Sequence, residues 1–135
     1  MWTKVPTLIY PLVIYNLLGF FASAELDRIL FSLILISGSD FTFTVNHLFL
    51  LLGIIALTIE VIKSTSTSTA TVIDHALSLI VFIIFLLEFI LIRFAGTPEF
   101  MILTLMALAD VITGFTVTIF AARRDVAFGG NYPSN

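Results

Sequence analysis

The sequence predicts an all-α membrane protein, with four transmembrane helices in an antiparallel bundle that forms a single domain. Three observations predict this fold class. The 135 residues are 59% hydrophobic and only 11% charged, whereas a soluble domain carries about 25% charged residues. Four apolar runs each hold about the 20 residues that a helix needs to cross about 30 Å of hydrocarbon. One bundle of such helices uses nearly the whole chain and leaves no length for a soluble catalytic module.

The first span is predicted over residues 5–24. Its beginning, with Lys4 ahead of an apolar run, loosely resembles the start of a signal peptide, and residues 20–24 resemble a cleavage site. The run is longer than the apolar region of about 7–15 residues that signal peptides use, so a retained helix is the favoured interpretation.

An amphipathic segment is predicted over residues 25–37, between the first and second spans. Glu25, Arg28 and Ser32 recur at helical spacing and form a polar face. The apolar residues of the other face are Leu26, Ile29, Leu30, Leu33 and Ile34. This pattern favours a helix lying in the outer membrane interface. A shallow re-entrant segment and an extension of the first span are the alternatives.

The remaining spans are predicted over residues 43–63, 71–94 and 98–122. The last of them begins with Thr97, Pro98 and Glu99, which supply an N-cap, a proline at the first helical position and an acid in the first turn. The second and third spans are joined by a short Ser/Thr link, which predicts an antiparallel pair. The tail over residues 125–135 is predicted to be a frayed end or a docking segment.

The basic residues near the ends of the spans predict the orientation. One side of the membrane would carry Lys4, Lys63, Arg123 and Arg124. The other side would carry Arg28 and Arg93. Because the cytoplasmic side carries the excess of Lys and Arg, both termini are expected in the cytoplasm.

Composition also argues against several classes of function. The net charge is −3 and the basic residues are scattered, which argues against nucleic acid binding and against a polybasic lipid switch. The chain has no cysteine, which excludes thiol redox chemistry, disulfides and zinc–thiolate sites. No phosphate-binding loop, nucleophile triad or HExxH motif occurs. We therefore expect a protein that is not an enzyme, with no cofactor, no metal site and no catalytic residue.

Five titratable side chains inside the apolar runs are candidate functional residues, because such groups are expensive in a membrane and functional by default. At 1.5 Å of rise per residue, Glu60 and His75 share a depth near the cytoplasmic side. His47 and Glu88 share a depth near the outer side, and Asp110 lies between the two pairs. Such a string is typical of a proton relay or a cation path. The favoured alternative is structural, with the acids acting as hydrogen-bond donors or acceptors between helices or subunits.

Small residues around Asp110 predict where the helices approach most closely. Ala107 and Gly114 lie within a turn of it and let a neighbouring helix come near, so the fourth span is expected to make the tightest helix contact, with Asp110 facing it. Glu60 is three residues before Lys63, a spacing that allows an ion pair on one helix.

Four short stretches resemble a family of small, uncharacterised four-span bacterial inner-membrane proteins. The stretches are Ile73–Ser78, Leu87–Phe89, Leu103–Val111 and Ala121–Asp125. The resemblance covers roughly the second to the fourth span. It implies a location in a bacterial inner membrane, and it implies no function.

The sequence therefore predicts a non-enzymatic accessory or assembly subunit, which joins a larger membrane complex or a homo-oligomer. Its expected partners are membrane lipids and other membrane subunits or copies of itself. One alternative is a protein that moves protons or cations through its intramembrane Glu, Asp and His side chains. A second is a protein that binds lipid, quinone or pigment, which needs an outer cavity lined by His47 and Glu88.

Overall fold

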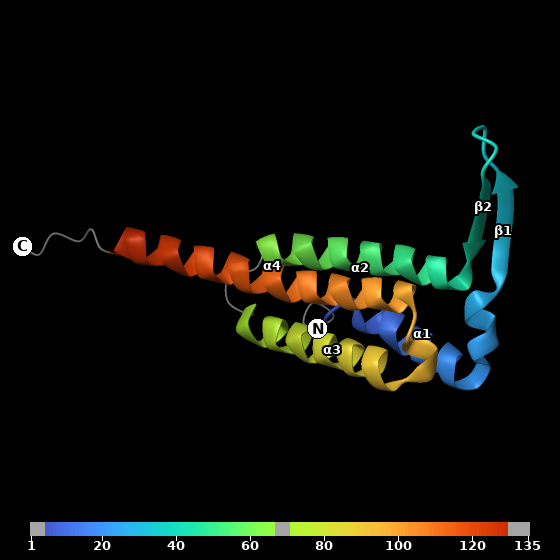
Figure 1. Ribbon diagram of the computed structural model, residues 1–135. Helices are drawn as coiled ribbons and strands as arrows, with labels where there is room; N and C mark the ends of the chain where they lie inside the picture. Colours follow the sequence, from blue (N-terminus) through green and yellow to red (C-terminus); the bar gives the residue numbers. More distant parts are fainter. Residues whose placement is uncertain (1–4, 67–70, 130–135) are drawn as a thin grey trace, which may run out of the picture.

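The computed structural model describes residues 5–66 and 71–129, and these residues are mostly helical. The elements in chain order are α1 (Ile9–Ala22), the 3-10 helix η2 (Ser23–Asp27), β1 (Ile29–Ile34), β2 (Asp40–Thr44), α2 (Val45–Ser66), α3 (Thr71–Leu91), the 3-10 turn η3 (Arg93–Ala95) and α4 (Pro98–Gly129). The four α-helices lie side by side, with the strands at one end (Figure 1). All four are long and apolar enough to cross a membrane, which confirms this part of the prediction.

Helix α4 is the central element, because it packs against both α2 and α3. Its buried residues Phe100 and Leu103 meet Phe85 of α3 and the fully buried Tyr15 of α1 in one apolar core. Gly53 of α2 lies against α4, where an added Cβ would come within 2.5 Å of the Leu103 side chain. This glycine therefore lets the two helices approach closely.

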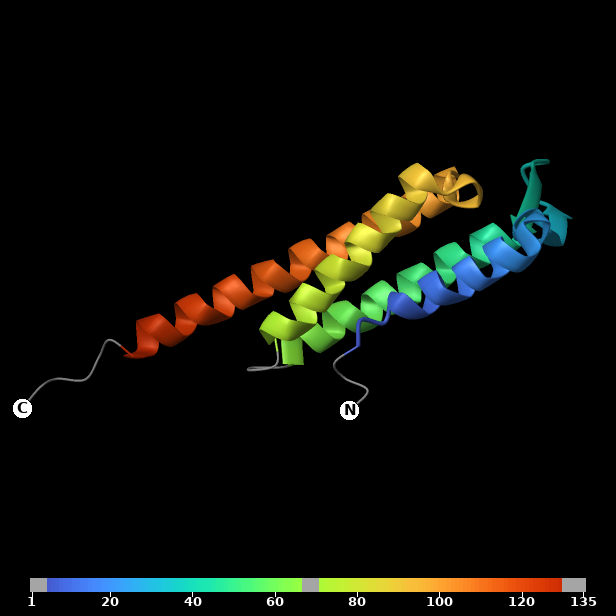
Figure 2. The same ribbon diagram turned by 90° about the horizontal axis from the view of Figure 1, so that it is seen from below.

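The beginning of α4 follows the predicted capping pattern. The Phe100 N–H donates to the Thr97 hydroxyl oxygen over 3.2 Å, Pro98 is the first helical residue and Glu99 lies in the first turn. Helix α4 then continues to Gly129, past the ends of α2 and α3 that lie beside it (Figure 2). The predicted tail over residues 125–135 therefore begins as helix, and its last six residues lie outside the described part.

The segment between α1 and α2 corrects the sequence prediction, because residues 25–37 do not form an amphipathic helix. The short turn η2 is followed by β1, which pairs antiparallel with β2 in a two-stranded sheet. Residues 43 and 44, expected to open the second span, belong to β2. Gly38 adopts a φ of 83° in the connecting turn, a backbone conformation that glycine reaches without strain. Ser37–Ser39 thus lies in the turn of a β-hairpin.

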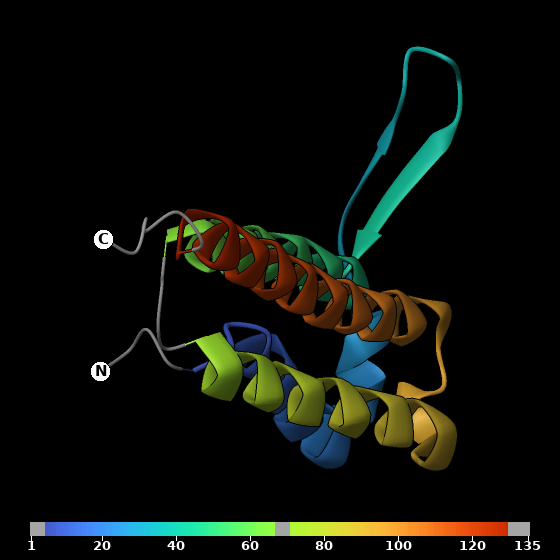
Figure 3. The same ribbon diagram turned by 90° about the vertical axis from the view of Figure 1, so that its left-hand side faces the viewer.

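The hairpin, defined as residues 29–44, projects away from the helices (Figure 3). Phe31 of β1 is paired with Phe43 of β2, and their rings stack with centroids 5.1 Å apart. The Phe41 ring lies 6.2 Å from the ring of Phe31. Phe31 and Phe41 remain 48% and 41% exposed, respectively, so this aromatic face is only partly covered by the chain itself.

Candidate functional site

The polar residues predicted near one side of the bundle come together at the helix ends opposite the hairpin. Glu60 of α2 is 9% exposed, and its Oε1 accepts hydrogen bonds from the Thr7 N–H and from the Thr7 hydroxyl at 2.7 Å. The Lys63 ammonium lies 3.0 Å from the same oxygen and 3.2 Å from the Val5 carbonyl oxygen. Glu60 thus holds the residues that precede α1 against α2.

Asp110 of α4 lies in the same region and is 8% exposed. It accepts a hydrogen bond from the Ser78 hydroxyl of α3, and the charges of Glu60, Lys63 and His75 are near enough to act on its carboxyl group. We call these five residues the polar cluster. It draws together three of the predicted titratable residues, namely Glu60, His75 and Asp110, from three different helices.

His75 packs directly onto the backbone of α4. A Cβ added to Gly114 would lie 2.3 Å from the His75 Nδ1, so only glycine leaves room for the ring at this position. The ring also lies 5.9 Å from the Phe115 ring, and its Nε2 is buried without a hydrogen-bond partner among the described residues. Ala107, the other predicted packing residue, is 1% exposed in the apolar core.

The expected pair of His47 and Glu88 does not form, which corrects the prediction from matched depth. Glu88 of α3 accepts a hydrogen bond of 2.7 Å from the Asn16 side-chain amide of α1. His47 instead lies beside Thr44, whose N–H and hydroxyl are each 3.0 Å from the His47 Nδ1. Equal depth along two helices says nothing about which way each side chain points around its helix, and each residue meets a nearer polar group.

The predicted string of titratable groups is consequently divided. Among the described residues, no hydrogen bond links Glu88 or His47 to the polar cluster. The two residues also line separate depressions, with Glu88 between α1 and α3 and His47 between β2 and α2. The hypothesis of a lipid, quinone or pigment site requires one outer cavity lined by both residues, and the pockets that His47 and Glu88 line among the described residues are separate ones.

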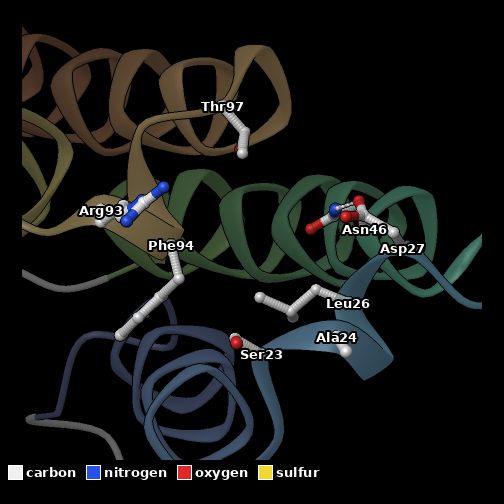
Figure 4. A pocket seen from close by; sticks show the side chains of 8 residues that line it. All are labelled: Ser23, Ala24, Leu26, Asp27, Asn46, Arg93, Phe94 and Thr97. Atoms are coloured by element: carbon white, nitrogen blue, oxygen red, sulfur yellow. Dashed lines mark hydrogen bonds between the residues drawn. The ribbon is translucent and has the colours of Figure 1, made fainter.

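A cavity of about 450 Å³ lies at the hairpin end, between the ends of α1 and α3 and the beginnings of α2 and α4 (Figure 4). Its lining residues are Ser23, Ala24, Leu26, Asp27, Asn46, Arg93, Phe94 and Thr97. Asn46 is 3% exposed, and its amide donates to the Asp27 Oδ1 over 3.0 Å. The Tyr15 hydroxyl in turn donates to the Asn46 Oδ1 over 3.2 Å.

The sequence analysis did not predict this cavity, although the polar residues at the span boundaries indicate it. The sequence pattern gave Arg93 a role only in the predicted orientation, and it predicted no role for Asp27 or Asn46. Each of them is a polar residue at a span boundary, and such residues gather at one end once the helices are assembled. Their proximity depends on the turns η2 and η3, which the apolar periodicity does not predict.

Within residues 5–66 and 71–129, no group of three or more His, Asp or Glu side chains is arranged to hold a metal ion. Comparison of the chain with protein-family models, with curated proteins and with solved structures gives no match.

Proposed function

We propose that this chain is a non-enzymatic, multi-pass membrane subunit that assembles with a larger membrane complex or with copies of itself. In this proposal, α1–α4 form an antiparallel transmembrane bundle in a bacterial inner membrane. The length and apolar character of the four helices support the bundle. The resemblance to small four-span bacterial proteins supports the choice of membrane.

The proposed orientation places both termini in the cytoplasm. The hairpin end carries Arg28 and Arg93, and the opposite end carries Lys63, Arg123 and Arg124. The end with more basic residues faces the cytoplasm by the positive-inside rule. The hairpin then lies at the outer surface, where it is available to a partner on that side of the membrane.

The observation that carries the assembly role is the uncovered hairpin. All six residues of β1 are exposed, among them Ile29, Leu30 and Ile34 on a strand that also carries Phe31. A sheet of two strands is marginal by itself, and its unpaired edges are templates for another chain. Because the hairpin combines unpaired strand edges with exposed apolar side chains, a protein partner that pairs with the edge and covers those side chains is favoured.

The first experiment is native mass spectrometry of the particle, extracted from its own membrane in a mild detergent. We expect either defined larger subunits in fixed ratio to this 14.9 kDa chain, or a homo-oligomer of it. A single chain with only lipid attached, under conditions that preserve known membrane complexes, would contradict the proposal.

Truncating the aromatic face of the hairpin is expected to release the chain from its assembly. Each buried Phe contributes about 1.5–3 kcal/mol, so Phe31→Ala combined with Phe41→Ala should weaken association by about 100-fold or more. Native mass spectrometry over a dilution series measures this. The matched control is Phe120→Ala, because Phe120 is also exposed, at 59%, but lies on α4 away from the hairpin. Equal dissociation in both variants would count against the hairpin.

A second candidate function, translocation of protons or cations, is favoured by the polar cluster. Three of the five predicted titratable side chains gather there from three helices, and the His75 Nε2 has no partner among the described residues. Buried groups of this kind are typical of ion pathways.

The translocation hypothesis predicts that Asp110→Asn abolishes dissipation of a pH gradient in liposomes while the protein stays folded. The amide keeps an acceptor for the Ser78 hydroxyl but cannot lose a proton. Asp40→Asn, at the exposed start of β2, is the control and should leave the flux unchanged. Normal flux in Asp110→Asn would exclude Asp110 from the path. Loss of flux in Glu88→Gln would extend the path to the contact of Glu88 on α3 with Asn16 on α1.

A further inference from the structure

We propose that the cavity at the hairpin end binds a zwitterion that carries a primary ammonium and a phosphate diester, as in the headgroup of phosphatidylethanolamine. The proposal rests on the membrane placement proposed above, but not on assembly. It assigns a ligand to residues that none of the functions above uses.

The two charged residues of the cavity stand on opposite sides and do not pair. Arg93 extends from η3 on one side, and Asp27 lies beside Asn46 on the other (Figure 4). The ion pairs formed among the described residues, Arg28 with Glu25 and Lys63 with Glu60, include neither of them. The cavity therefore offers one positive and one negative group across a space of about 450 Å³. A ligand that carries both a negative and a positive group can pair with Arg93 and with Asp27 at the same time.

The exposed Asp27 side chain, which forms the negative wall, is held in place by the buried Asn46. Asn46 binds Asp27 through its amide nitrogen and Tyr15 through its amide oxygen, so one Asp27 oxygen is fixed and the other stays available. The hydroxyl of Tyr15, which is fully buried, also lies 3.4 Å from the Phe94 carbonyl oxygen. This network joins the beginning of α2 and the turn η3 to α1, which pre-organises the acceptor and lowers the cost of binding.

The chemistry of the walls favours a primary ammonium over a quaternary one. A primary ammonium donates hydrogen bonds to a carboxylate, as a trimethylammonium group cannot. Recognition of quaternary ammonium uses aromatic cages, and the one aromatic ring lining this cavity, Phe94, lies on the Arg93 side (Figure 4). The Arg93 guanidinium matches a phosphate oxygen pair. A purely anionic headgroup would meet the Asp27 carboxylate.

The surroundings also suit a lipid tail. The Phe94 ring rests on Gly19, where a Cβ would come within 2.3 Å of it, and contacts the Phe20 ring with centroids 4.9 Å apart. Phe20 itself is 66% exposed on α1. An apolar surface thus continues from the cavity along α1, in the direction that acyl chains would take from a headgroup at the membrane interface.

The test is native mass spectrometry of delipidated protein titrated with phosphatidylethanolamine, phosphatidylcholine and phosphatidylglycerol that carry identical acyl chains. We expect the unmodified protein to prefer phosphatidylethanolamine to phosphatidylcholine by about tenfold, the effect of a charged hydrogen bond. Equal binding of the three lipids to the unmodified protein would overturn the proposal without any variant.

The variants test each wall separately. Arg93→Gln should weaken phosphatidylethanolamine and phosphatidylglycerol alike, by about tenfold. Asp27→Asn should weaken phosphatidylethanolamine by a similar factor and leave phosphatidylglycerol unchanged or bound more tightly. The matched controls are Arg28→Gln and Asp40→Asn, which remove like charges from exposed positions at the same end, outside the cavity lining. Variants that behave like these controls would overturn the proposal.

Soluble glycerophosphoethanolamine separates the two sources of this chemistry. If it displaces the lipid at similar concentration, the cavity holds the free headgroup compound, and the proposed recognition stands. If it does not, the acyl chains contribute and the ligand is the lipid. Because this assay reports bound lipid and not subunits, loss of lipid selectivity is distinguishable from failure of the assembly role.

Discussion

Glu60→Leu is expected to destabilise the protein by about 3 kcal/mol, the largest effect of any single substitution considered for this chain. Leucine removes the acceptor for the Thr7 N–H, the Thr7 hydroxyl and the Lys63 ammonium together. These groups lose their carboxylate partner in a region where Glu60 is only 9% exposed. The start of α1 should separate from α2, and equilibrium unfolding in detergent measures the loss.

The chain offers a matched control for this substitution. Glu25 also pairs with a basic residue three positions later, Arg28, but the two side chains are 50% and 68% exposed. An exposed pair contributes about 0–1 kcal/mol, so Glu25→Leu should change the stability little. Glu60→Gln, which keeps an acceptor for Thr7, should fall between the two. Equal effects of Glu60→Leu and Glu25→Leu would show that Glu60 does not anchor α1.

Gly114→Ala is expected to destabilise the protein by about 1–3 kcal/mol, as overpacking of a filled core does. The added methyl group would lie 2.3 Å from the His75 Nδ1 and 2.6 Å from its Cε1. The imidazole ring is 7% exposed and is also confined by Phe115, so α3 has to move away from α4. Equilibrium unfolding of the variant measures this cost.

Two further variants separate the steric effect from helix propensity. Gly129→Ala makes the same change at the end of the same helix, where nothing lies within 4 Å of the new atom, and it should be neutral or slightly stabilising. In the background of His75→Ala, the cost of Gly114→Ala should largely vanish, since the ring that clashes is gone. Additive effects in this double-mutant cycle would refute the steric explanation.

The helices were predictable because their signal is long and local. An apolar run of about 20 residues is too long to be a β-strand, so its length alone indicates a helix. The cap at Thr97 and Pro98 marks a helix start by residue type alone. The ion pair of Glu60 with Lys63 follows from spacing on one helix in the same way. Each of these features depends on neighbours in the sequence.

The hairpin was mispredicted because a short apolar segment fits two periods. Between residues 29 and 34 apolar side chains occupy both faces of the strand, so the segment lacks the alternation that indicates a strand. The few polar residues at helical spacing therefore favoured a helix incorrectly. The strand is selected by its pairing with residues 40–44, which stacks Phe31 on Phe43, and by the turn at Gly38. Pairing of this kind is a tertiary contact that a single-segment pattern does not contain.

The predicted polar contacts also differ in whether they depend on position along a helix or on rotation about its axis. The rise along each helix predicted a shared level for Glu60 and His75, and both lie in one region. Asp110, which was expected between the two pairs, lies in that region as well. It failed for His47 and Glu88, because rotation about each helix axis decides the partner. The partner of Glu88 is Asn16, a polar side chain within the first apolar run, and a polar residue in such a run is itself a signal for a polar contact between helices.

The continuous length of α4 makes it a lever arm. From Gly114, where His75 fixes the contact with α3, to Gly129 the helix has no break, and at 1.5 Å per residue this arm is about 22 Å long. A change of about 10° in tilt at Gly114 would swing the tip by about 4 Å. Small repacking beside His75 would therefore displace Arg123 and Arg124 relative to the rest of the bundle.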